Sequence, residues 1–203
     1  MKLEWQVEYI EKNGTDAVHG NLMMINNNDN VINKEKWEKE NDERREVNWE
    51  QLNNEELARR IFLKPNIRII SSVVTREIFE KIRGFKDQFF GGEDETFWFE
   101  VGLFGKVGFL DRVVFYRREH ENNSLDIYRI KRLNGYLKSV RYIHKYYRKI
   151  IANHYTSKEF RLLWACVATR LKSRKYLSSF RYFLEIFLLY PIKTIKNIIK
   201  MIK

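Results

Sequence analysis

The sequence predicts an α/β domain followed by a basic helical region. Up to about residue 125, strand-like apolar segments alternate with amphipathic helical segments, as in mixed α/β domains. Beyond that point the pattern is almost entirely helical. The charge changes at the same place: residues 1–125 carry 19 Lys and Arg against 24 acidic residues, whereas residues 126–203 carry 19 against three. We therefore expect two parts, 1–125 and 126–203, with opposite net charges.

Composition narrows the classes of protein to which this 203-residue chain can belong. Hydrophobic residues make up 44% and aromatic residues 15%, which argues against disorder. The single cysteine, Cys166, excludes an internal disulfide, and its apolar neighbours predict a buried thiol. No segment reaches the roughly 18–20 apolar residues that span a bilayer, and residues 1–15 lack the apolar core of a signal peptide. We expect a cytoplasmic protein that can also bind peripherally to the inner face of the membrane.

Local patterns predict the elements of the first part. Helices are expected over 3–12, 55–60 and 76–82, the second capped by Asn53 or Asn54 and the third closed by Gly84. Strands are expected over 17–25, 67–74 and 107–117. The highly charged residues 31–50 are expected to be exposed.

The basic part is expected to form helices over 126–153, 157–172 and 174–190, with a terminal piece after Pro191. Lys and Arg alternate there with aromatic and aliphatic residues, as in 136–142 and 192–200. Such helices suit an anionic membrane surface, and the alternative is a helical cap with a solvated basic face. A nucleic-acid partner is not expected, because no binding motif is present and the acidic first part repels phosphate.

Three consecutive acids carry the strongest chemical signal. Gly91-Gly92 precede Glu93, Asp94 and Glu95, where an apolar helix is expected to begin. The helix macrodipole stabilises acids at this position, and that alone accounts for a lone acid. The two glycines, however, let the backbone approach a ligand closely, and Trp98 lies one turn after Asp94 on the same face. From these residues alone, both helix capping and a general base that takes a proton from a sugar hydroxyl stay open.

His120 follows the expected strand 107–117 and lies beside Arg117 and Arg118. A loop histidine of this kind is usually solvated, although it can bind a metal ion. The arginine pair can bind phosphate, but such pairs at strand ends are commonly solvated or salt-bridged.

Residues 65–125 resemble the second half of the catalytic domain of family 2 glycosyltransferases, which are inverting enzymes with a GT-A fold (nucleotide-diphospho-sugar transferase-like). The resemblance rests on the order and spacing of several segments: 3–9, which is similar to the helix after that family's Asp-x-Asp; 70–79, before the acceptor loop; 82–86, its Gly-Gly-Phe-Asp turn; 92–98, its Gly-Glu-Asp-acid motif; and 107–120, the closing strand with its metal-binding histidine. Arg83 and Lys86 depart from the turn motif.

The resemblance implies roles for four residues. Asp94 is the expected catalytic base, which deprotonates the acceptor hydroxyl. Glu93 and Trp98 are expected to shape the acceptor site, the acid by hydrogen bonds and the indole by packing on a sugar face. His120 is the expected ligand of a divalent cation, Mg²⁺ or Mn²⁺, that neutralises the leaving nucleoside diphosphate.

The sequence also departs from the family, because it contains no Asp-x-Asp. The donor-binding half is expected to lie before Met1, lost by truncation, or on a separate polypeptide, and we expect the isolated chain to be inactive. The expected function is transfer of a sugar from a nucleotide-sugar donor to a glycan or lipid-linked acceptor, with inversion, in surface polysaccharide synthesis. The alternative is a non-catalytic membrane-associated or binding protein that retains part of the fold.

Overall fold

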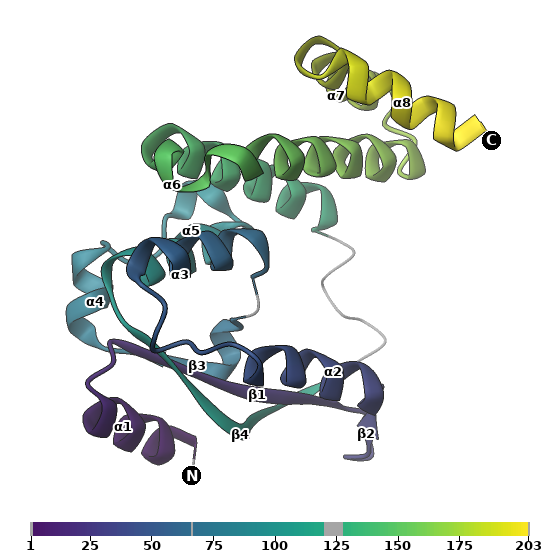
Figure 1. The fold of residues 1–203 in the computed structure, drawn as a ribbon. Coiled ribbons are helices and arrows are strands. Elements are labelled where there is room, and N and C mark those ends of the chain that lie inside the picture. The colour runs from purple at the N-terminus through teal and green to yellow at the C-terminus, as the bar shows by residue number, and fades with distance from the viewer. Residues whose placement is uncertain (1, 66, 120–127, 203) are drawn as a thin grey trace. The chain divides into compact units, whose positions relative to one another are not determined.

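The computed structural model describes residues 2–65, 67–119 and 128–202. The chain divides into two compact units (Figure 1). The first comprises residues 1–86 and 94–124, and the second comprises residues 87–93 and 125–203. The short segment 87–93 therefore groups with the helical residues of the second unit.

The first unit is built on an open, mixed, four-stranded sheet. Its central strand is β1 (Ala17–Ile25), and β4 (Val107–Arg118) runs parallel to β1 along its whole length. Two short strands pair antiparallel with β1. Strand β3 (Ser72–Val74) pairs with the first residues of β1, and β2 (Val31–Ile32) pairs with its last residues. The predicted α/β class is thereby confirmed. The predicted strand 67–74 is only partly formed, because Ile69–Ser71 make a 3-10 turn before β3.

Helices cover both faces of this sheet (Figure 1). Helix α1 (Lys2–Asn13) lies on one face, where a Cβ atom on Gly108 would come within 2.3 Å of Tyr9 Cε1. The buried Gln6 amide on α1 donates a hydrogen bond to the Ser71 carbonyl (3.0 Å). On the other face, α3 (Asn54–Leu63), α4 (Arg76–Lys81) and α5 (Glu93–Phe104) form the main hydrophobic core with the sheet. The core includes Ala17, Leu57, Ile61, Ile78, Phe97, Val101 and Val107.

Local capping explains where α3 and α4 begin. Asn53 and Glu56 form a reciprocal capping box, in which Asn53 Oδ1 accepts from the Glu56 amide (3.0 Å) and Glu56 Oε2 accepts from the Asn53 amide (3.1 Å). The neighbouring Asn54 instead donates to the Leu103 carbonyl (3.0 Å), so Asn53 is the cap. The side chain of Thr75 caps α4.

The turn after α4 contains Arg83, Gly84 and Lys86. Arg83 and Gly84 have left-handed backbone conformations, with φ of 61° and 60°, and the Gly84 amide donates to the Phe79 carbonyl (2.9 Å). Lys86 forms an ion pair with Glu100, whose side chain is buried in α5. The positive charge at position 86 therefore neutralises an acid of the core.

The expectation that residues 31–50 are exposed is wrong for part of this segment. It forms α2 (Lys34–Arg45), and Asn41, Arg44 and Trp49 are buried. The Arg44 guanidinium donates to Asn41 Oδ1 (2.7 Å), and the Trp49 indole donates to the Arg44 carbonyl (2.9 Å). Because hydrogen bonds satisfy the polar groups on its buried face, α2 does not need an apolar stripe. Its sequence pattern is therefore the same as that of an exposed charged helix, which is why the sequence did not predict its burial.

His19 is the most unusual side chain of the central strand. It is fully buried, and its ring lies edge-on to Trp49 (centroids 4.4 Å apart) and close to Phe109 (5.1 Å). Neither ring nitrogen has a hydrogen-bond partner among the residues that the structure describes. Burial, together with the nearby positive charge of Arg44, lowers the pKa of His19 to about 3. The imidazole is therefore neutral and serves as an aromatic core residue.

The second unit consists of helices folded against one another. Helix α6 (Arg129–Lys172) contains a break at Tyr147, whose φ and ψ are −127° and 29°. The two arms fold back on each other, since His144 stacks on Tyr155 (3.6 Å) and Arg170 donates to Asn134 (2.6 Å). The sequence predicts two helices here with a break near 154–156, and the break in fact lies earlier.

Two further helices, α7 (Tyr176–Leu189) and α8 (Pro191–Ile202), follow this hairpin. The core of the second unit joins both arms of α6 to α7 through Leu137, Leu163, Val167 and Ile186. Cys166 is buried, as predicted, and burial raises the pKa of its thiol. Within the parts of the chain that the structure describes, no helix is both long and apolar enough to cross a membrane.

The burial of His19 predicts a specific acid sensitivity. Below pH 6.5 the unfolded chain binds a proton at His19 that the folded chain does not bind until about pH 3, so stability is lost as the pH falls through this window. We expect His19 to cost about 2 kcal/mol of unfolding free energy between pH 7 and pH 5. Urea unfolding of the wild type and of His19→Leu, followed by tryptophan fluorescence at several pH values, measures this contribution. It is the difference between the two proteins in how the unfolding free energy changes with pH. Parallel pH profiles would contradict a neutral buried imidazole.

Candidate active site

Helix α5 begins where the sequence places the three acids. A 3-10 turn, η2 (Asp87–Phe89), precedes it, and the Gly92 amide donates to the Phe89 carbonyl (2.6 Å). Of the three acids, Glu93 is half-buried, Asp94 is exposed and Glu95 is buried. Asp94 is thus the carboxylate that solvent or a substrate can reach, and it lies at the positive end of the helix macrodipole.

The two glycines before α5 serve a close contact between backbone segments. Gly91 has a φ of 81°, a conformation that favours glycine. A Cβ atom on Gly92 would lie 2.4 Å from the backbone of Gly135 on α6, and one on Gly135 would lie 2.0 Å from the Phe90 carbonyl oxygen. The sequence predicted that these glycines let a ligand approach the backbone, but in the structure it is the backbone of α6 that lies against them. This contact fixes the loop that leads into the acids.

Trp98 lies in the core. Its side chain is 3% exposed and packs edge-on against Phe97 (centroids 5.3 Å apart). The observed partners of the indole are therefore core side chains. Stacking of Trp98 on a sugar stays a prediction, and the burial of the ring does not favour it.

Glu93 is better placed for a polar ligand. Its Oε2 atom is buried, and no described residue donates a hydrogen bond to it. A buried carboxylate oxygen without a donor is costly, and a hydroxyl group of a bound sugar would satisfy it. The acceptor-binding role of Glu93 stays a prediction.

A groove runs beside the loop that leads to α5. It consists of two hollows of about 350 and 470 Å³, both lined by Gln88 and Lys138. Lysines and aromatic rings dominate the remaining lining, which includes Phe89, Phe90, Lys131, Tyr142, Lys145 and Tyr146. Arg141 also reaches the groove, but Glu159 and Glu185 neutralise it. The lysines therefore give the groove a positive charge that suits an anionic group.

The predicted metal ligand, His120, lies outside the described residues. Among the residues that are described, no group of three His, Cys, Asp or Glu side chains is arranged to hold a metal ion. Arg118, next to this position, donates to the Asn26 carbonyl (2.6 Å) and pairs with Asp29, so it fixes the turn after β1.

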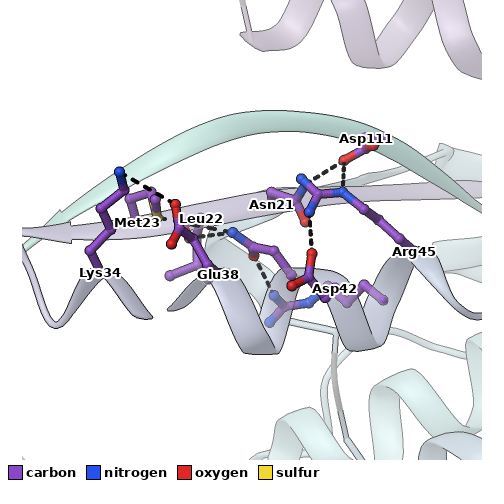
Figure 2. A network of polar contacts seen from close by, with 10 residues as sticks. Asn21, Leu22, Met23, Lys34, Glu38, Asp42, Arg45 and Asp111 are labelled. Atoms are coloured by element: carbon purple, nitrogen blue, oxygen red, sulfur yellow. Dashed lines mark hydrogen bonds and ion pairs between the residues drawn. The ribbon is translucent and has the colours of Figure 1, made fainter. Parts of the chain in front are cut away.

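The structure contains a polar network on the sheet that the sequence did not predict (Figure 2). The pairing of β1 with β4 shifts after Gly20 and leaves Asp111 in a bulge. Asp111 Oδ1 accepts hydrogen bonds from Asn21 Nδ2 (2.8 Å) and Arg45 Nε (2.7 Å), and Arg45 also pairs with Asp42. The hydrogen bond to Asp111 raises the pKa of Arg45. Because the carboxylate of Asp111 is satisfied in this way, the network ties α2 to the sheet.

Comparison with known proteins does not assign this site. No model of a known protein family matches the chain, and no curated protein has a significantly similar sequence.

The contact between Gly135 and the loop can be tested by substitution. In Gly135→Ala, the added methyl group would collide with the Phe90 carbonyl, so we expect residues 87–92 to move away from α6. Amide hydrogen exchange in this loop should rise by about tenfold, although alanine favours the helix itself by roughly 1 kcal/mol. Lys138→Ala, an exposed substitution on the same helix, is the matched control and should leave the exchange unchanged. Equal exchange in both variants would contradict this packing.

Proposed function

We propose that this chain is the acceptor-side half of an inverting glycosyltransferase in which Asp94 is the catalytic base. The observation that carries the proposal is the placement of the three acids: Asp94 alone is exposed, at the first turn of α5, while Glu95 is buried. The open α/β sheet with helices on both faces is the class of fold that the proposal requires. The proposal is also supported by the resemblance to family 2 glycosyltransferases, in which similar motifs occur in the same order.

The proposed chemistry is an in-line displacement at the anomeric carbon of the donor. The Asp94 carboxylate takes the proton of the acceptor hydroxyl as that oxygen attacks. A new bond forms between the acceptor oxygen and the anomeric carbon, and the bond to the nucleoside diphosphate breaks with its electron pair on the leaving phosphate. The anomeric configuration is inverted, and the proton on Asp94 passes to solvent.

The acceptor side of the reaction is assigned to residues of this chain. Glu93 Oε2 can accept a hydrogen bond from a second acceptor hydroxyl, which would orient the nucleophile. Within the second unit, the lysines of the groove suit an anionic group such as a phosphate. We therefore propose a glycan or lipid-linked acceptor, used in surface polysaccharide synthesis on the cytoplasmic side of the membrane.

The donor side is assigned to other residues. The sequence contains no Asp-x-Asp, so binding of the nucleotide sugar and of its Mg²⁺ or Mn²⁺ requires a further segment or a second polypeptide. The resemblance assigns His120 to that cation. The charge on the leaving diphosphate would be stabilised there.

A second candidate function is a membrane-associated protein without catalysis. The exposed apolar side chains on α7 and α8 favour it, since they form a surface that the catalytic proposal does not use. The two candidates differ in whether Asp94 matters.

The isolated 203-residue chain is expected to show no transfer. Incubation with a panel of uridine- and guanosine-diphosphate sugars and with Mg²⁺ or Mn²⁺ should release no nucleoside diphosphate above the enzyme-free background. The physical reason is that the sequence lacks the Asp-x-Asp that would complete a cation site for the donor's diphosphate. Robust turnover of any sugar nucleotide by the purified chain would contradict the division into two halves.

Asp94→Asn tests the base directly in a polypeptide or complex that includes the donor-binding half. The amide has the same size but does not accept a proton, so kcat should fall by about 10²- to 10⁴-fold with little change in the melting temperature. Asp87→Asn, which changes another acid of the loop region, is the matched control and should retain activity. An Asp94→Asn enzyme with full activity would remove the proposed base and leave the non-catalytic candidate.

A further inference from the structure

Helices α7 and α8 carry an apolar surface that the rest of the second unit does not cover. On each helix a set of exposed apolar side chains recurs every three or four residues, so this set forms a stripe along one face. We call this surface the α7–α8 stripe; it comprises Leu177, Phe180, Leu184, Leu188, Ile192, Ile195 and Ile199. Leu177 is 85% exposed and Leu188 is 71% exposed, although leucine is among the residue types most often buried.

The opposite faces of these helices are already used in packing. Ile186 and Ser179 of α7 are buried, and the Ser179 hydroxyl donates to the Val167 carbonyl of α6 (3.1 Å). Thr194 of α8 is also buried and donates to the Tyr190 carbonyl (2.8 Å). The stripe is therefore a second apolar face, in addition to the one that forms the core.

Positive charge surrounds the stripe. Residues 173–203 contain seven Lys and Arg and one acid, Glu185. Arg181, Lys193 and Lys196 are exposed and directly follow stripe residues in the sequence, so they flank it. Glu185 forms an ion pair with Arg141 of α6, which leaves the positive charge of this region unopposed.

This charge selects the partner. A second copy of the chain would bring two strongly basic surfaces together, and like charges across an interface oppose association. An anionic lipid surface offers the opposite: headgroups for the Lys and Arg and acyl chains for the apolar side chains. Lysine and arginine next to buried apolar groups can extend their charged ends to the headgroups.

We propose that the α7–α8 stripe binds the surface of an anionic lipid bilayer. Helix α7 has 14 residues and α8 has 12, which gives lengths of about 21 and 18 Å, less than the roughly 30 Å of a bilayer core. Both helices therefore lie in the interface, with Leu177, Leu188 and Ile192 inserted at the boundary between headgroups and acyl chains. This surface does not depend on the proposed glycosyl transfer.

Flotation of the full chain with lipid vesicles tests the proposal. We expect binding to phosphatidylcholine vesicles with about 30% phosphatidylglycerol to be about tenfold stronger than to pure phosphatidylcholine, and to weaken on raising salt from about 0.1 to 0.5 M. Leu177→Asp/Leu188→Asp and Ile192→Asp/Ile195→Asp should each lower the bound fraction about tenfold. Lys193→Glu/Lys196→Glu should lower binding to anionic vesicles by a similar factor.

Controls separate a lipid contact from loss of structure. Leu3→Asp changes an apolar residue that is 64% exposed on α1 and should bind vesicles like the wild type. Because every substituted side chain of the stripe is already exposed, helicity by circular dichroism should be unchanged in the stripe variants. Equal binding to neutral and anionic vesicles, or unchanged binding of both stripe variants, would overturn the proposal. So would a wild-type dimer that the stripe variants convert to monomer while no species binds vesicles.

Discussion

The parallel pairing of β1 with β4 is the interaction on which the first unit depends. It joins residues 17–25 to residues 107–118 and so closes the longest loop of that unit. With this pair in place the sheet has two faces, one for α1 and one for α3, α4 and α5. The bulge at Asp111 belongs to the same pairing, and its hydrogen bonds tie α2 to the sheet. Removing the pair would leave both helical layers without a surface to cover.

Close backbone contact plays the corresponding role for the loop before α5. Gly92 and Gly135 let this loop and α6 approach to a distance that any side chain would prevent. The loop therefore groups with the helical unit, while the helix that it leads into belongs to the α/β unit. Asp94 is the first residue of the α/β unit after this loop.

Charge is used differently in the two units. In the α/β unit, acids form local ion pairs, as the buried Glu100 does with Lys86 and the exposed Asp111 does with Arg45. In the helical unit most cations have no acid to pair with, since residues 126–203 contain three acidic residues. Such an excess of charge opposes self-association and favours an anionic partner. The proposed acceptor groove and the proposed lipid surface both follow from this excess.

The sequence alone determined the features that depend on neighbouring residues. Strands 17–25 and 107–117, a cap at position 53 or 54, the turn at Gly84 and the helix that starts at the three acids follow from short-range patterns. Tertiary structure decided what depends on residues far apart in the chain: the buried polar face of α2, the burial of Trp98 and the fold-back of α6 at Tyr147. Gly91-Gly92 show most clearly what the sequence cannot predict. Two glycines permit close approach to the backbone, but they do not indicate whether the approaching group is a ligand or Gly135, which lies 43 residues after Gly92. Only packing between distant segments makes that choice.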